Sequence, residues 1–211
     1  QPEVGDGSVG RAAAIGLVGA AVVANASGTA VGNALGLSSA DATAITSAWS
    51  AVVGATRVDG LAPSDADLAV LGVASPGTPQ ALALVVSAIQ GSSEADVGSV
   101  AALNALAGAA ANVVAAADGK GALTVQDLQA LGVEGVTADN LDAVAHALVT
   151  LGVQNLPTNV EALAEVVQTV VQDTTGPALT VADTLGTDSG LTATVAQGGA
   201  TRDSTVVVSG S

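Results

Sequence analysis

The chain has 211 residues, with no cysteine, methionine, phenylalanine or tyrosine, one tryptophan, one histidine, and a formal net charge of −15. Its composition excludes disulfides, thiol chemistry and a zinc site closed by cysteine and histidine. The acidic surface disfavours nucleic acid as a partner because it repels phosphate. Hydrophobic residues make up 49% of the chain, too many for intrinsic disorder.

The apolar stretch from Ala12 to Ala24 is the first candidate element. A bilayer span needs about 20 such residues, so we expect no membrane span. No signal-peptide pattern begins the chain, and we expect a mature or processed form. Further on, Ile45, Trp49, Val52 and Val53 share one helical face within residues 40–53. Trp49 is interpreted as core, with a plug between subunits as the alternative.

An internal repeat follows at an offset of 60 positions. Residues 67–73 and 127–133 share Asp-Leu followed by Leu-Gly-Val, and residues 100–103 match 160–163 at three positions. Such a fixed period is typical of repeated supersecondary units. Each unit is predicted to hold three short helices, because capping residues and terminal glycines separate runs at helical spacing. The predicted caps and stops are Ser64, Gly72, Thr78, Gly91, Ser99, Thr124, Gly132, Thr137 and Gly152.

The C-terminal segment changes character after Asp173-Thr174-Thr175-Gly176-Pro177. Residues 178–182, 191–196 and 204–209 alternate as strands do. An immunoglobulin-like (Ig-like) sandwich needs about seven strands, so this segment is predicted to be incomplete and to be finished by another unit or chain. The fold class is therefore mainly α, a bundle of short-helix repeats, with a C-terminal β-rich, incomplete Ig-like segment.

Four domains follow from these patterns. Residues 1–56 form a degenerate N-terminal helical unit, residues 57–116 and 117–172 form two helical repeats, and residues 173–211 form a β-strand connector.

Two stretches resemble a known family. Residues 123–144, with Leu131-Gly132-Val133 and Gly135-Val136-Thr137-Ala138, resemble helical repeats of very large bacterial surface adhesins. Residues 173–181 are similar to the opening strand of the Ig-like repeats in those proteins. The resemblance implies an extracellular, cell-surface role in adhesion or in a biofilm matrix. The chain departs from the family pattern because it lacks the rest of an Ig-like unit and a calcium-binding nonapeptide array.

Metal chemistry has two weak candidates. Asp118, Gly121, Leu123 and Asp127 follow part of the EF-hand rhythm, but the loop lacks most of the oxygen ligands that calcium requires. We favour a plain loop with Asp127 near a helix start. Asp183 and Asp188 flank a turn and are candidate calcium ligands, with turn formation as the favoured alternative. No cofactor is expected, with calcium left open.

The sequence contains few side chains that could act in catalysis. His146 is the single histidine and can pair with Asp142 one helical turn away. Any nucleophile–base triad would have to use it, and no G-x-S-x-G elbow or phosphate-binding loop is present. We therefore expect a protein that is not an enzyme.

These observations favour a structural protein, a subunit or segment of a bacterial surface filament or adhesin. Its partners would be copies of itself or adjacent repeats, assembled by helix packing and β-strand addition. The candidate interaction residues are Leu179, Val181, Trp49 and a donor strand of Thr205, Val206, Val207 and Val208. The alternative is a monomeric binding module of a surface adhesin that captures a host or matrix ligand.

Overall fold

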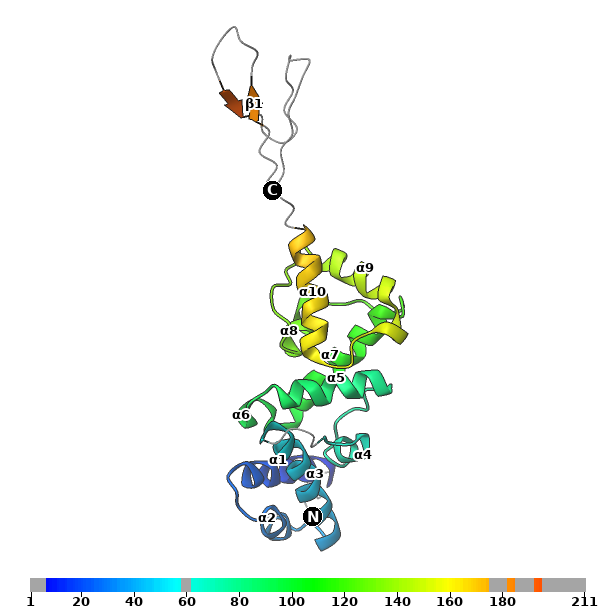
Figure 1. Cartoon of the computed structure of the whole chain (residues 1–211). Helices are drawn as coiled ribbons and strands as arrows, with labels where there is room; N and C mark the ends of the chain where they lie inside the picture. Colours follow the sequence, from blue (N-terminus) through cyan, green and yellow to red (C-terminus); the bar gives the residue numbers. More distant parts are fainter. Residues whose placement is uncertain (1–6, 58–61, 175–181, 185–191, 195–211) are drawn as a thin grey trace, which may run out of the picture. The chain divides into compact units, whose positions relative to one another are not determined.

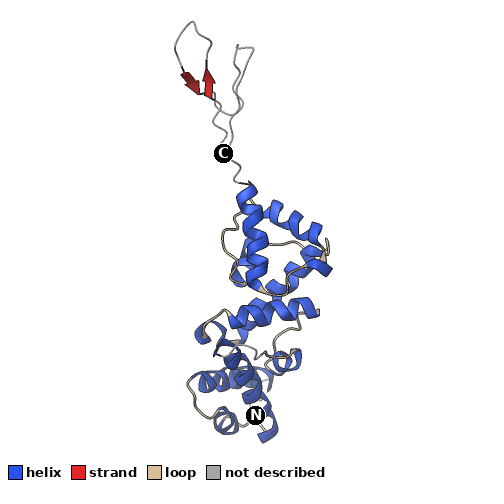
Figure 2. Ribbon diagram, viewed as in Figure 1, coloured by secondary structure: helices blue, strands red, loops and turns tan. Residues whose placement is uncertain are grey.

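The computed structural model describes residues 7–57, 62–174, 182–184 and 192–194. It separates into two units, Gln1–Val171 and Gln172–Ser211. In the first unit the described residues form helices and loops (Figures 1 and 2). The chain is therefore mainly helical, which confirms the α part of the predicted fold class.

The N-terminal helices are α1 (Gly7–Val23), α2 (Gly28–Ala34) and α3 (Ser39–Arg57). Each of the three contacts the other two. Ser27 caps α2 by accepting a hydrogen bond from the Ala30 backbone N–H at 3.3 Å. Gly28 and Gly32 are buried because side chains of α3 lie where a Cβ atom would stand. The small residues of α2 thus bring its backbone close to α3.

Two similar series of helices follow along the chain (Figure 1). The first contains α4 (Asp65–Val70), α5 (Pro79–Gln90), α6 (Glu94–Val97) and α7 (Val100–Ala117). The second contains α8 (Val125–Ala130), α9 (Leu141–Leu151), the 3-10 helix η1 (Val153–Asn155) and α10 (Val160–Thr174). Element order and position therefore agree between the two series. The four-part domain division stays a prediction.

The first helix of each series begins and ends in the same way. Ser64 and Thr124 form capping boxes with the carboxylates of Asp67 and Asp127. Gly72 and Gly132 then take positive φ angles of 77° and 85°, a conformation that glycine adopts without steric cost. The valine after each glycine donates its N–H back into the helix, at 3.0 Å for Val73 and 2.9 Å for Val133. These local signals were readable in the sequence, and the predicted caps and stops at these positions are confirmed.

One predicted boundary is wrong. The sequence places a helix start at Thr137, but α9 begins at Leu141. The side-chain oxygen of Asn140 accepts from the Thr137 N–H at 2.8 Å, and its amide donates to the Gly135 carbonyl at 3.1 Å. The asparagine side chain therefore stabilises a turn in place of the first helical turn.

The core is aliphatic apart from Trp49. Fully buried leucines recur at matching places in the two series, Leu68 with Leu128 and Leu103 with Leu163. The long helix α7 contacts α5, α8 and α9 and so links the two series. Among the described residues α7 is also the one helix long and apolar enough to cross a membrane by length and composition, and half of it is buried in the structure. The predicted stretch Ala12–Ala24 falls mostly in α1.

In the second unit the described residues are the end of α10 and the strands β1 (Ala182–Thr184) and β2 (Thr192–Thr194). The two strands pair antiparallel, with Asp183 opposite Ala193. The predicted β-strand connector begins at residue 173, but Asp173 and Thr174 are the last residues of α10. The rest of the predicted β-rich, Ig-like segment lies outside the described residues, and that part of the fold prediction is unconfirmed. Leu179, Val181, Asp188, Thr205, Val206, Val207 and Val208 all belong to it.

Candidate interaction surface

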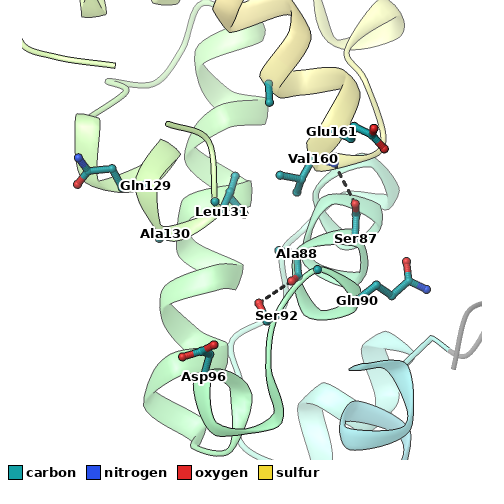
Figure 3. A pocket seen from close by; sticks show the side chains of 13 residues that line it. Ser87, Ala88, Gln90, Ser92, Asp96, Gln129, Ala130, Leu131, Val160 and Glu161 are labelled. Carbon is teal, nitrogen blue, oxygen red and sulfur yellow. Dashed lines mark hydrogen bonds between the residues drawn. The ribbon is translucent and has the colours of Figure 1, made fainter. Parts of the chain in front are cut away.

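A groove lies where the two series of helices meet (Figure 3). It has a volume of about 670 Å³. Its walls come from the C-terminal half of α5 and the turn after it, from α6, from the end of α8 and from the start of α10. The lining is mixed, with Ser87, Gln90, Asp96, Gln129 and Glu161 beside small or aliphatic residues. The groove therefore offers both hydrogen-bonding groups and apolar surface.

A hydrogen bond between two lining residues joins α5 to α10. The hydroxyl oxygen of Ser87 on α5 accepts from the backbone N–H of Val160 at 2.9 Å (Figure 3). Val160 is the first residue of α10, where the N–H groups have no partner within the helix. Asn159 satisfies a second such group, because its side-chain oxygen accepts from the Ala162 N–H at 2.7 Å. The start of α10 is thus capped partly by its own loop and partly by the preceding series.

The groove is acidic as well as polar. Asp96 and Glu161 line it, and none of its lining residues is basic. Its carboxylates favour cationic or hydrogen-bond-donating groups over phosphate or sulfate. Such a surface is suited to contacts with a peptide or a polar matrix. Among its lining residues there is no histidine or cysteine to act as a base or nucleophile.

A charged pair ties α3 to α6. Arg57, in the last turn of α3, forms two hydrogen bonds to the carboxylate of Glu94 in the first turn of α6, one of them at 2.7 Å. The same guanidinium donates to the side-chain oxygen of Asn25 at 3.1 Å. Hydrogen bonding from Arg57 lowers the pKa of Glu94, and the carboxylate in turn raises the pKa of Arg57. This pair fastens the N-terminal helices to the first series.

Two further ion pairs are local or exposed. Arg11 on α1 contacts Asp41 on α3 at 3.3 Å. Hydrogen bonds to the Asp41 carboxylate lower its pKa, and the bond from the Ser38 hydroxyl contributes more than the bond from Arg11. Lys120 contacts Asp118 at 2.6 Å, and this bond raises the pKa of the lysine. Exposed pairs of this kind contribute little to stability.

Trp49 belongs to the interior of the N-terminal helices. Its side chain is fully buried, and its Nε1–H donates to the backbone carbonyl of Ile15 on α1 at 2.9 Å. The core interpretation of this residue is therefore confirmed. The alternative of a plug between subunits is wrong, because a buried indole presents no surface to another chain.

In the loop with the partial EF-hand pattern, the two aspartates make contacts at the ends of helices. Asp118 is the C-cap of α7 and pairs with Lys120, while Asp127 closes the capping box of α8 and accepts from Asn112 at 2.9 Å. The expectation that Asp127 stands near a helix start is confirmed. Among the described residues no group of three or more His, Cys, Asp or Glu side chains is placed to hold a metal ion. Asp183 lies in β1, and Asp188 is outside the described residues.

His146 lies exposed on α9. Its backbone carbonyl accepts from the Thr150 hydroxyl at 2.9 Å. The ion pairs within the described part of the chain do not include one between His146 and Asp142. The predicted pairing of these two side chains is therefore not present in this structure.

Sequence reasoning did not single out Ser87, Arg57 or Glu94. Ser87 precedes Val160 by 73 positions, and Glu94 follows Arg57 by 37. No local pattern connects partners so far apart. The single available signal was the scarcity of basic residues, four in the whole chain, which makes each one a candidate for a specific contact.

Comparisons with known proteins found no match for this chain among family models, curated proteins or solved structures.

Proposed function

We propose that this chain is a non-enzymatic structural protein of the bacterial cell exterior, a subunit or segment of a surface filament or adhesin. The observation that carries the proposal is the correspondence between two series of helices 60 residues apart. Matching caps, matching positive-φ glycines and matching buried leucines recur in both. Proteins that are extended in one dimension are commonly built by stacking copies of one structural unit.

The finer architecture belongs to the same proposal. The helical part is a bundle of repeats of about 60 residues, and the segment after α10, from residue 175 onward, is an incomplete Ig-like unit that connects to a neighbour. Antiparallel pairing of Ala182–Thr184 with Thr192–Thr194 supports a β character for this segment. Thr205 to Val208 act as the donor strand through their backbone groups.

The acidic surface also supports an exterior role. A net charge of −15 keeps an aliphatic chain soluble, and the ions of the surroundings screen the repulsion between neighbouring units. Contacts between units then rest on aliphatic side chains and on backbone hydrogen bonds, which need no charge.

The test uses proline as a probe of backbone pairing. Val206→Pro and Val207→Pro each remove one N–H from the proposed donor strand, while Val206→Ala and Val207→Ala keep it. We expect the full chain and the alanine variants to assemble in light scattering and negative-stain images. Deletion of Ser204–Ser211, and at least one proline variant, should abolish assembly and leave the helical circular dichroism unchanged. If the deleted chain still assembles, strand donation by this segment is wrong.

The groove at the junction favours a second candidate function, a monomeric binding module. Its volume of about 670 Å³ and its mixed lining are suited to a peptide or matrix ligand. A monomer of constant mass that binds immobilised matrix material saturably, and loses this binding on Glu161→Lys or Asp96→Lys, would favour this candidate over the filament.

A further inference from the structure

The three long helices α3, α7 and α10 begin with the same kind of cap. In each case a side-chain oxygen just before the helix accepts a hydrogen bond from a backbone N–H three residues further on. The acceptors are Ser38, with Asp41 as the donor at 3.1 Å, Ser99, with Ala102 at 3.1 Å, and Asn159, with Ala162 at 2.7 Å. Consecutive caps are about 60 positions apart. The period of the two later series therefore extends back to α3, and the three helices can be compared position by position from their caps.

One face of α3 and of α7 is buried where the next series of helices begins. Helix α3 contacts α4, α5 and α6, and α7 contacts α8 and α9. Asn112 on α7 donates to Asp127 on α8 at 2.9 Å, which places this side of α7 against the second series. The aliphatic residues at equivalent positions of this face are at most 3% exposed: Ala48, Val52 and Ala55 on α3, and Ala109, Val113 and Ala116 on α7. Both helices thus bury the same pattern, a valine between two alanines, at the junction with the following unit.

Helix α10 departs from this pattern. Thr169 takes the place of Ala109, and its side chain is exposed. Its hydroxyl donates to the Glu165 carbonyl within the helix at 2.9 Å. One turn later, the sequence places Asp173 where α7 has Val113. The face with which α7 contacts the second series is therefore polar on α10.

These two residues oppose the stacking of a further helical unit on α10. A threonine at the place of Ala109 adds a hydroxyl and a methyl group to a closed junction, and overpacking of this kind is destabilising. An aspartate at the place of Val113 would bury a carboxylate among aliphatic side chains, which costs far more. In repeat arrays each unit contacts its neighbours, and the terminal units carry a polar outer face that keeps the array soluble. Helix α10 has the chemistry of such an end.

We propose that Thr169 and Asp173 close the helical array at α10, because they stand at the two positions that decide whether a long helix accepts a further helical unit. The partner that α3 and α7 accept is a short capped helix followed by a longer one, as in α4–α5 and α8–α9. The outer face of α10 excludes such a partner, whether it belongs to the same chain or to a second copy. In the proposed filament, contacts between chains therefore lie elsewhere. This inference goes beyond the proposed function, and its tests measure folding stability instead of assembly or ligand binding.

The first test exchanges the two residues in the full chain. Ala109→Thr puts the larger side chain at the junction between α7 and the second series, and Thr169→Ala puts the smaller one on α10. We expect Ala109→Thr to lower the urea midpoint by at least about 0.5 M and to accelerate hydrogen exchange in α8 and α9. Thr169→Ala should keep the midpoint within roughly 0.2 M of the wild type. Equal midpoints for the two variants would overturn the proposal.

The second test offers α10 a further helical unit. A second copy of residues 115–174, inserted after Thr174, continues the spacing that connects α7 to α8. With the native α10, we expect circular dichroism to show two separate unfolding steps in urea, because the inserted helices do not stack on it. With Thr169→Ala and Asp173→Val in the first copy of α10, the steps should merge into one steeper transition, since more surface becomes exposed at once.

Both other outcomes of this insertion count against the proposal. A single step in both chains means that the native α10 accepts a helical unit. Two steps in both chains mean that Thr169 and Asp173 do not decide whether a unit stacks. Either result overturns the proposal.

Discussion

The indole of Trp49 occupies the space where Gly19 would carry a side chain. A Cβ atom built at Gly19 lies 2.5 Å from Cε2 of Trp49, and the indole is held by its hydrogen bond to Ile15. A rigid, buried ring does not yield to a methyl group. Gly19→Ala should therefore destabilise the N-terminal helices by about 1–3 kcal/mol, although alanine is the better helix former. Urea unfolding followed by the fluorescence of this single tryptophan measures the change.

Gly108→Ala is the matched control for this prediction. Gly108 lies inside α7, and a Cβ atom there meets nothing within 4 Å. The substitution should stabilise the chain by about 0.5–1 kcal/mol through helix propensity alone. A Gly19→Ala chain as stable as the Gly108→Ala chain would show that α1 does not pack against Trp49 in this way.

Ser87→Ala should loosen the start of α10. The substitution removes the acceptor for the Val160 N–H in a half-buried position, and we expect a loss of about 0.5–1.5 kcal/mol in the free energy of unfolding. Hydrogen exchange at the Val160 amide should accelerate. Ser50→Ala is the control, because the Ser50 hydroxyl donates to the Thr46 carbonyl within its own helix at 2.8 Å. Equal effects of the two substitutions on Val160 exchange would contradict the link between α5 and α10.

The sequence predicted the local features of this fold and missed its long-range ones. Caps such as Ser64 and Thr124, and stops such as Gly72 and Gly132, depend on residues within one helical turn, and their chemistry is visible in a short window. The spacing of Ile45, Trp49 and Val52 also predicted a buried face. That Trp49 contacts Gly19 is different, because it depends on how α1 crosses α3.

The start of α9 shows why even a local prediction can be wrong. Thr137 has the chemistry of a cap, and Asn140 accepts from the Thr137 N–H as the third residue of a capping box does, but its amide also donates to the Gly135 carbonyl ahead of the helix. Both residues are good helix starters and turn formers, and the sequence does not rank them. The interaction candidates from Thr205 to Val208 stay predictions, since they lie outside the described residues.

The capping boxes at the starts of α4 and α8 allow a direct comparison of the two series. Ser64→Ala and Thr124→Ala each remove an acceptor for the N–H of the third helical residue, at 3.2 Å in both cases. Each substitution should lower the free energy of unfolding in urea by about 1 kcal/mol. The two losses should be similar, because α4 and α8 have the same length and each buries a leucine at the equivalent position.

Thr150→Ala serves as the control for the caps. Its hydroxyl donates to the His146 carbonyl inside α9, so its loss should change stability by no more than about 0.5 kcal/mol. If only one of the two cap substitutions exceeded this control, the two series would not be energetically equivalent.

Acidification should weaken the contact between Arg57 and Glu94. Hydrogen bonding from Arg57 lowers the pKa of Glu94 from its ordinary value of 4.5. A carboxyl whose pKa is lower in the folded state contributes stability above its unfolded pKa, and this contribution disappears as the pH falls through the lower folded value. The wild-type chain should therefore exceed Glu94→Gln in thermal midpoint at pH 7, and the difference should shrink as the pH falls below 4.5.

Salt and a second glutamate provide the checks on this pair. The pair is partly exposed, with side-chain exposures of 38% for Arg57 and 31% for Glu94, so added salt should also reduce the difference. Glu165→Gln alters an exposed glutamate on α10 that pairs with no basic side chain in the described part of the chain. Its midpoint should follow the wild type from neutral to acidic pH. A Glu94→Gln midpoint that differs from the wild type equally at both ends of the range would mean that the ionised carboxylate does not fasten α6 to α3.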